Sequence, residues 1–289
     1  MRARLAILLF ALMAYAIASA QAPSTPAPAF EVASVKINRS GRVGGAIQVP
    51  PAGTITFINA PLRVLIRNAY QVDAYAESYK LDPGPYAGII GTPSGGPQPG
   101  VPRFDVIGKP PENTEPAARR AMMRTLLKDR FKLRVHREMR QMPVYALTVA
   151  REGRLGPNLA ASEYDCQTYL AQRRAGGTAE EPVDANGDSW CRFQGAMLAG
   201  LGVVIARFAG PVAVLAQRLQ PSVDRPILDA TGLSGHYEWD LRYAFRPDAP
   251  ADFPTLFTAL QEQLGLRLEP RQAPVEVLVV DSVELPTPD

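Results

Sequence analysis

Apolar and polar residues recur along the chain with two periods, which predict strands and helices in alternation. Period two is typical of a strand with one buried face. It occurs in 131–136 and 237–243, and further strands are predicted at 30–37, 54–58 and 203–208. Spacings of three and four residues are typical of an amphipathic helix. They occur in 62–69, 116–128, 212–219 and 253–264. The pattern predicts an α+β fold of helices packed on mostly antiparallel sheets.

One ten-residue segment occurs twice, as Arg140–Val149 and again as Arg271–Val280, with six identical positions. Each copy follows a helical segment and a short alternating stretch, 131–134 in the first copy and 266–269 in the second. A recurring supersecondary unit indicates duplication. We therefore expect two tandem related units, each closing with a helix followed by a β-hairpin, in which Pro143 begins the second strand of the first hairpin. If the unit is duplicated, equivalent positions pack in the same way, and packing is enough to explain why the same residues recur.

The amino end has the three parts of a secretory signal peptide. Arg2 and Arg4 precede an apolar run, which ends in the small residues Ala18-Ser19-Ala20. The alternative is an uncleaved anchor, but the run is short for a bilayer span and a Pro-rich stretch follows it. We expect an exported protein, periplasmic or extracellular, without a membrane span after cleavage. The expected divisions are a signal peptide at 1–20, a Pro/Ala-rich tether at 21–29, a first unit at 30–150, a connector at 151–191 and a second unit at 192–289.

The chain has two cysteines, Cys166 and Cys191, both in the part expected to be exported. Outside the cytoplasm a pair of thiols is usually oxidised, so we expect a disulfide in the connector. A metal site is the weaker interpretation, because no histidine lies near either cysteine in the sequence.

Charge is nearly balanced, since the chain has 31 basic and 28 acidic residues and the signal peptide contains two of the basic ones. Overall charge therefore does not favour nucleic acid as a partner. The segment 119–140 is locally basic and predicts a binding face for an anionic partner. Its candidate residues are Arg119, Arg120, Arg124, Lys132, Arg134 and His136. The alternative is a solvated face with local ion pairs.

No set of residues with the spacing of a known reaction centre is evident. His136 and His236 are the only histidines, and neither has the further ligands that a catalytic zinc needs. We therefore assign no catalytic residue, no metal and no cofactor. An enzyme remains an alternative, with a site between the units that would use scattered carboxylates such as Asp229, Glu238 and Asp240.

Several short segments of the sequence together resemble a known family. They are FEVASVK at 30–36, NAPLRVLIRNAY at 59–70, DRFKL at 129–133, DATGLSGHY at 229–237 and ALQEQLGL at 259–266. They are similar to an uncharacterised secreted family of soil bacteria, expanded in Acidobacteria such as Solibacter and known as a domain of unknown function. The resemblance implies an envelope protein, sometimes attached to membrane metallopeptidase sensors, without known catalytic residues. The loop after Gly84 departs from the family pattern, because it is long and lacks the expected Trp.

The order of helices and strands is also distantly similar to the short N-terminal domain of secretins and TonB-dependent receptors, which serves in envelope docking. Our leading hypothesis is an exported, non-enzymatic binding or interaction module whose partner is an envelope protein or polymer. The alternatives are a hydrolase acting on a peptide or glycan, and a sensory partner of a membrane metallopeptidase.

Overall fold

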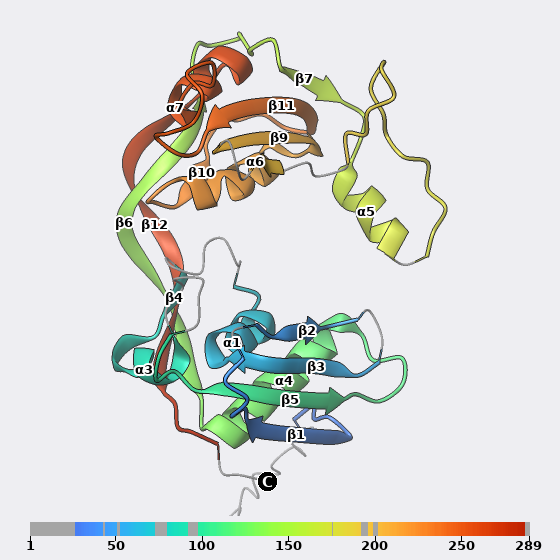
Figure 1. Ribbon diagram of the computed structural model, residues 1–289, viewed down its shortest axis with the longest axis vertical. Coiled ribbons are helices and arrows are strands. Elements are labelled where there is room, and N and C mark those ends of the chain that lie inside the picture. The colour runs from blue at the N-terminus through green and yellow to red at the C-terminus, as the bar shows by residue number, and fades with distance from the viewer. Residues whose placement is uncertain are drawn as a thin grey trace, which may run out of the picture.

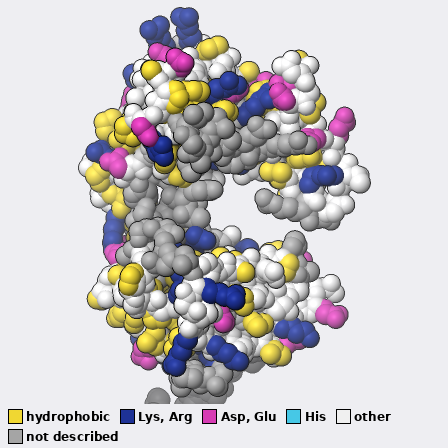
Figure 2. All heavy atoms as spheres, viewed as in Figure 1, with side chains coloured by type: hydrophobic (Ala, Val, Ile, Leu, Met, Phe, Trp, Pro, Cys, Tyr) yellow, Lys and Arg dark blue, Asp and Glu magenta, His cyan; other side chains and the backbone are white. Residues whose placement is uncertain are grey.

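The chain forms two lobes joined by a long two-stranded ribbon, with a hollow between the lobes (Figures 1 and 2). This architecture is seen in a computed structural model that describes residues 27–286 except 43, 51–52, 73–79, 92–97, 175, 192–195 and 199–201. Helices and mostly antiparallel sheets confirm the predicted α+β class. The expected signal peptide and most of the expected tether lie outside the described residues. Within the described part, no helix is both long and apolar enough to cross a membrane.

Lobe 1, the lower lobe in Figure 1, is a four-stranded antiparallel sheet with two helices packed on one face. The sheet has the order β1-β5-β3-β2. Its strands are β1 (Val32–Ile37), β2 (Ala46–Gln48), β3 (Ile55–Pro61) and β5 (Arg103–Lys109). The helices are α1 (Leu62–Tyr70) and α4 (Pro116–Phe131). Phe57, Phe104 and Phe131 are fully buried between the sheet and the helices.

Lobe 2 repeats this arrangement in the order β7-β11-β9-β8. Its strands are β7 (Leu159–Ser162), β8 (Ala196–Leu198), β9 (Val203–Gly210) and β11 (His236–Ala244). Its helices are α6 (Val212–Leu219) and α7 (Leu256–Ala259), which continues as η3 (Leu260–Leu264). In lobe 1 the strand before α1, β3, pairs with the strand before α4, β5. In lobe 2 the strand before α6, β9, pairs in the same way with the strand before α7, β11. The duplication is therefore present in the topology as well as in the sequence.

The expected hairpins are wrong, because each copy of the repeated segment belongs to one long strand. These strands are β6 (Arg134–Val149) and β12 (Leu266–Ser282), which pair with each other antiparallel along their length. Pro143 lies opposite Gln272 and Pro274 lies opposite Gln141, so the two prolines take equivalent places around the central pair Met142–Ala273. The duplicated strands thus pair about a local two-fold axis.

The prolines are tolerated within these strands because their nitrogens point away from the partner strand. The amide of Tyr145 donates outward to Pro226 O at 2.7 Å, so the odd-numbered amides of β6, including position 143, face away from β12. By the same alternation the nitrogen of Pro274 also faces outward. A proline in such a position removes no hydrogen bond between the two strands.

Each long strand contributes to the cores of both lobes. Leu278 and Val280, near the end of the chain, pack in the core of lobe 1, whereas Leu147 of β6 packs in the core of lobe 2. The expected boundaries at 30–150 and 192–289 therefore do not follow the two cores. Two short strands complete the ribbon sheet in the order β10-β6-β12-β4. They are β4 (Leu81–Asp82) and β10 (Ile227–Asp229), each parallel to its neighbour.

The connector is anchored to lobe 2. The predicted disulfide between Cys166 and Cys191 is confirmed, with the Cα atoms 5.0 Å apart and both residues buried in the core of lobe 2. Cys166 begins α5 (Cys166–Arg174). Further along the connector, Asp184 binds Arg207 of β9, whose guanidinium lies 4.0 Å from the centre of the Trp190 ring.

The Gly/Pro-rich stretch after Asp82 has more structure than its composition predicts. It contains the short helices η1 (Gly84–Tyr86) and α3 (Ala87–Ile90). Ile90 is fully buried in the core of lobe 1, and Tyr86 and Ile89 pack partly against that core. These apolar side chains anchor a segment that glycine and proline alone would leave irregular.

Candidate functional site

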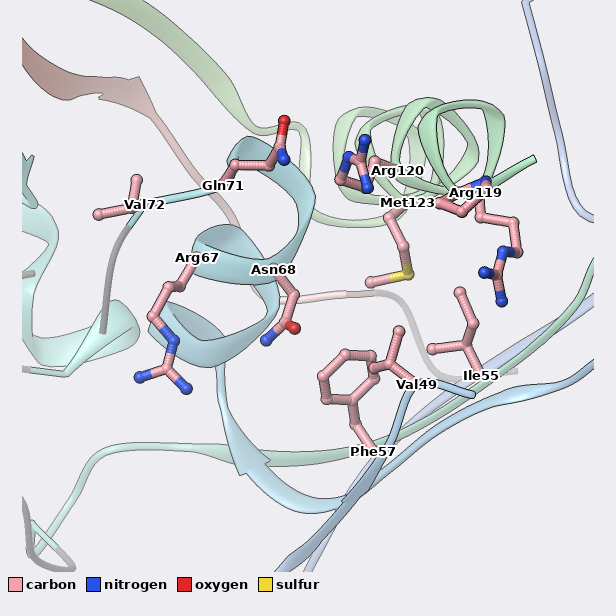
Figure 3. A pocket seen from close by; sticks show the side chains of 11 residues that line it. Val49, Ile55, Phe57, Arg67, Asn68, Gln71, Val72, Arg119, Arg120 and Met123 are labelled. Carbon is pink, nitrogen blue, oxygen red and sulfur yellow. The ribbon is translucent and has the colours of Figure 1, made fainter. Parts of the chain in front are cut away.

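Lobe 1 contains a pocket of about 340 Å³ between the sheet and the facing ends of its two helices (Figure 3). We call it the basic pocket. The end of β2 and strand β3 supply its floor, the last turn of α1 supplies one wall, and the first two turns of α4 supply the other. It is lined by Val49, Ile55, Phe57, Arg67, Asn68, Gln71, Val72, Pro116, Arg119, Arg120 and Met123.

Two helix ends define the walls. Helix α1 stops at Gln71, which adopts the left-handed conformation with φ 57° and donates its N–H to Arg67 O. Such a cap ends a helix sharply, and Gln71 and Val72, at this end of α1, line the pocket. Pro116 occupies the first turn of α4, where its missing N–H costs no helical hydrogen bond. The amino end of α4 also adds a partial positive charge to this side of the pocket.

The floor of the pocket is apolar. Phe57 and Ile55 point from β3 toward Met123 of α4, and Val49 lies beside them (Figure 3). Phe57 is fully buried, and Ile55 and Met123 are each 3% exposed. Val49 is 47% exposed, so the apolar surface extends outward from the floor. The floor can therefore take a hydrocarbon or aromatic group out of water.

Three arginines, Arg67, Arg119 and Arg120, line the pocket, and none of the described residues that line it is a carboxylate. Arg119 is 4% exposed and donates from Nη1 to the backbone oxygen of Pro50. Arg120 is half-buried on the neighbouring position of α4. Because guanidinium groups stay charged at any physiological pH, the pocket keeps a positive potential above an apolar floor.

The structure brings only two of the six predicted basic-face residues, Arg119 and Arg120, into the pocket. Arg124 donates to the backbone oxygen of Ala69 at 2.9 Å and lies over the ring of Tyr70, so it ties α4 to α1. Burial raises the pKa of the Tyr70 hydroxyl, and Arg124 opposes that rise.

The other three predicted residues lie at or beyond the carboxyl end of α4. Lys132 is the cap residue of that helix and donates to Asp129 O at 2.8 Å, while Arg134 is exposed at the start of β6. His136 Nδ1 lies 2.7 Å from the Asp281 carboxylate, and its Nε2 lies 3.5 Å from Glu138. The hydrogen bond with Asp281, and a weaker one with Glu138, raise the pKa of His136 against the effect of desolvation. These residues stabilise the ribbon locally and do not form one continuous face with Arg119.

Several pocket residues were missed from the sequence. Arg67 lies at the end of an amphipathic helix, where it reads as part of a solvated face, and Phe57 and Met123 read as ordinary core positions. The available signal was that one helix ends before strand β5 and another begins after it. That signal is weak, because sequence does not show which helix ends meet.

The corresponding place in lobe 2 is filled by a side chain. The guanidinium of Arg218 lies 4.1 Å from the centre of the Phe208 ring, which is fully buried on β9. Arg218 stands seven residues after the proline that precedes α6, and Asn68 stands seven residues after the proline that precedes α1. The shorter Asn68 donates from Nδ2 to Val64 O within its own helix at 2.8 Å and leaves the pocket of lobe 1 open.

The arginines of the basic pocket are suited to binding an anion. Its described lining residues include no histidine, cysteine or carboxylate, which are the usual general acids and bases. Among the scattered carboxylates, Asp229 lies on β10, whereas Glu238 and Asp240 lie on β11 of another sheet. In the part of the chain that the structure describes, no cluster of three His, Cys, Asp or Glu residues could hold a metal ion.

Comparison with protein families gives a match over most of the chain. The profile of a family described as "Protein of unknown function (DUF3738)" matches residues 64–283. The matched range begins within α1 and ends just after β12, so it covers lobe 2 and the part of lobe 1 that follows strands β1, β2 and β3. No curated protein and no solved structure matches the chain.

Proposed function

The chain belongs to the family of proteins of unknown function DUF3738, and from its own geometry we propose that it is an exported, non-enzymatic binding protein. Its ligand, an envelope component, enters the basic pocket with an anionic group on the arginines and a compact apolar group on the floor. The observation that supports this most is the set of three arginines around an apolar floor, with no carboxylate among the lining residues that the structure describes.

The size of the pocket limits the apolar part of the ligand. A cavity of about 150 Å³ holds one benzene ring, and the basic pocket has about 340 Å³. Two fused rings, or a branched chain of similar bulk, therefore fit, together with a carboxylate at the rim. A long extended chain would have to leave the pocket past Val49, the most exposed residue of the floor.

Arginine suits the anionic end because its planar fork donates two parallel hydrogen bonds to a carboxylate. Arg119 is held by Pro50 O, so it contributes mainly a fixed charge. Arg67 stands in the last turn of α1 and Arg120 near the start of α4, on the two walls of the pocket. Figure 3 shows the Arg67 side chain extending away from α4, so a carboxylate at the rim would bind mainly to Arg120.

The disulfide supports a function of this protein outside the cytoplasm. Cys166 and Cys191 are joined and buried, and disulfides of this structural kind persist in oxidising compartments. The signal-peptide pattern of 1–20 points the same way.

The proposal is tested by titrating 2-naphthoate, a fused-ring carboxylate, into the disulfide-bonded exported chain in a calorimeter. The neutral analogue 2-naphthylmethanol has the same rings and should bind at least about tenfold more weakly, because a charge-assisted hydrogen bond contributes roughly 1.5–3 kcal/mol. Arg120→Ala should weaken naphthoate binding by a similar factor, while Arg134→Ala, a matched change at an exposed arginine outside the pocket, should not.

A second variant copies lobe 2. Asn68→Arg should place a guanidinium over Phe57, as Arg218 lies over Phe208, and should abolish naphthoate binding while leaving the protein folded. The proposal fails if naphthoate does not bind to the wild-type chain, or if Asn68→Arg binds it with unchanged affinity.

A further inference from the structure

A second cavity, of about 630 Å³, lies in lobe 2, at the end of that lobe that is far from lobe 1. It lies between the loop that follows β6, the helix η3 and the first residues of β12. Figure 2 shows basic side chains projecting from this end of the upper lobe. We propose that this cavity, which we call the arginine cavity, binds a phosphate group of a larger phosphorylated molecule.

The backbone around the arginine cavity is held in place by the end of η3. The N–H of Gly156 donates to Leu264 O at 2.9 Å, that of Asn158 to Gln263 O at 2.8 Å, and that of Ala150 to Gly265 O at 2.8 Å. These bonds satisfy the last two carbonyl groups of the helix and that of its cap residue Gly265, which would otherwise repel an anion.

Two glycines allow this close contact. Gly265 has a φ of +67°, and a Cβ there would lie 2.5 Å from the nitrogen of Gly156. Since no other residue fits without displacing backbone, the loop bearing the arginines is packed directly on the helix end. A fixed loop loses little freedom when a ligand binds, which favours binding.

The charge of the arginine cavity is strongly positive. Arg151, Arg154 and Arg267 line it, and Glu262 is the one acidic residue among the described residues that line it. Arg267 forms an ion pair with Glu269. Among the ion pairs between described residues, none includes Arg151 or Arg154, so their guanidinium groups are available to a ligand.

Phosphate is the group that best fits this arrangement. Arginine forks bind phosphate oxygens bidentately, and two adjacent arginines match the double charge of a phosphate monoester. The cavity, about 630 Å³ in volume, is much larger than a phosphate ion. We therefore infer that the phosphate is attached to a polar body, such as a sugar or glycerol, that contacts Gln261 and the loop.

The test is calorimetric titration of the disulfide-bonded exported chain at low ionic strength with three probes, glycerol 3-phosphate, inorganic phosphate and glycerol. We expect glycerol 3-phosphate to bind more tightly than inorganic phosphate, and glycerol not to bind. The double variant Arg151→Ala/Arg154→Ala should weaken glycerol 3-phosphate binding by about tenfold or more. Arg173→Ala, at an exposed arginine on α5 of the same lobe, is the matched control and should leave it unchanged.

Glu262→Gln gives a result of opposite sign. Removing the one carboxylate of the cavity should strengthen phosphate binding severalfold, which a merely structural role of this exposed side chain would not produce. Equal affinity of the double variant and the wild-type chain would overturn the proposal, and so would binding of inorganic phosphate as tight as that of glycerol 3-phosphate, because the site would then hold a free ion only. Asn68→Arg should not affect phosphate binding, so the two sites are tested separately.

Discussion

Leu147 and Leu278 occupy the same position in the two copies of the repeated segment, yet each packs in the lobe formed mainly by the other half of the chain. Leu147 is 0% exposed in the core of lobe 2, and Leu278 is 3% exposed in the core of lobe 1. Replacing a buried leucine by alanine costs about 2–5 kcal/mol, through lost burial and the cavity that remains. Leu278→Ala should therefore destabilise lobe 1 by an amount in this range, although residue 278 lies after every helix and strand of lobe 2.

The two tryptophans allow the lobes to be followed separately. Trp190 and Trp239 are the only tryptophans of the chain, and both pack in or against the core of lobe 2. Urea unfolding followed by tryptophan emission should show a large loss of stability for Leu147→Ala and a smaller one for Leu278→Ala. Hydrogen exchange measured by mass spectrometry should show the reverse at the amides of 55–70 and 103–131. The reasoning is refuted if Leu278→Ala increases exchange mainly in lobe 2, or if both variants act alike on both lobes.

Three further predictions concern the ribbon and the connector. Reduction of the Cys166–Cys191 disulfide, which closes a segment of 25 residues, should lower the free energy of unfolding by roughly 3 kcal/mol, measured by urea titration with and without reductant; an unchanged midpoint would contradict this. Because its carboxylate partners raise the pKa of His136 above 6.5, its contribution to stability should be complete below that value and lost as the pH rises through the raised pKa. His136→Gln should remove that part of the pH dependence, and an identical pH profile of thermal unfolding would exclude the effect. Arg207→Met should leave Asp184 without its main hydrogen-bond partner, so the lowered pKa of Asp184 should rise toward its ordinary value, and limited proteolysis of 177–190 should be faster than in the wild-type chain.

Much of the fold was predictable because local patterns decide the individual elements. The helices near 62–69, 116–128 and 212–219 agree with α1, α4 and α6 to within a few residues, since the spacing of buried side chains and a leading proline act locally. The disulfide followed from the number of cysteines and their expected compartment. The duplication followed from the repeated segment.

Strand pairing was not predictable in the same way. A proline within an apolar stretch is equally consistent with a hairpin and with a long strand whose prolines face outward. The partner of Pro143 is Gln272, and nothing near Pro143 in the sequence indicates it. The pairing of β6 with β12 changes the expected domain organisation, because both lobes share these two strands and neither lobe is formed by one continuous half of the chain.

The candidate site was predictable only in part, for a related reason. Charge density along 119–140 indicated Arg119 and Arg120, but it gave the same weight to Arg124 and His136, which have partners within the fold. Only packing shows which basic side chains face a cavity. Arg67 and Phe57 could be joined to the site only once α1 and β3 were placed beside α4.

The central claim is that the basic pocket of lobe 1 is a ligand site, and hydrogen exchange with and without 2-naphthoate tests it most directly. The account predicts slower exchange at 55–57, 64–72 and 116–123 in the wild-type chain, and no change there in Asn68→Arg. Protection confined to lobe 2 or to the ribbon, or equal protection in both proteins, would contradict it.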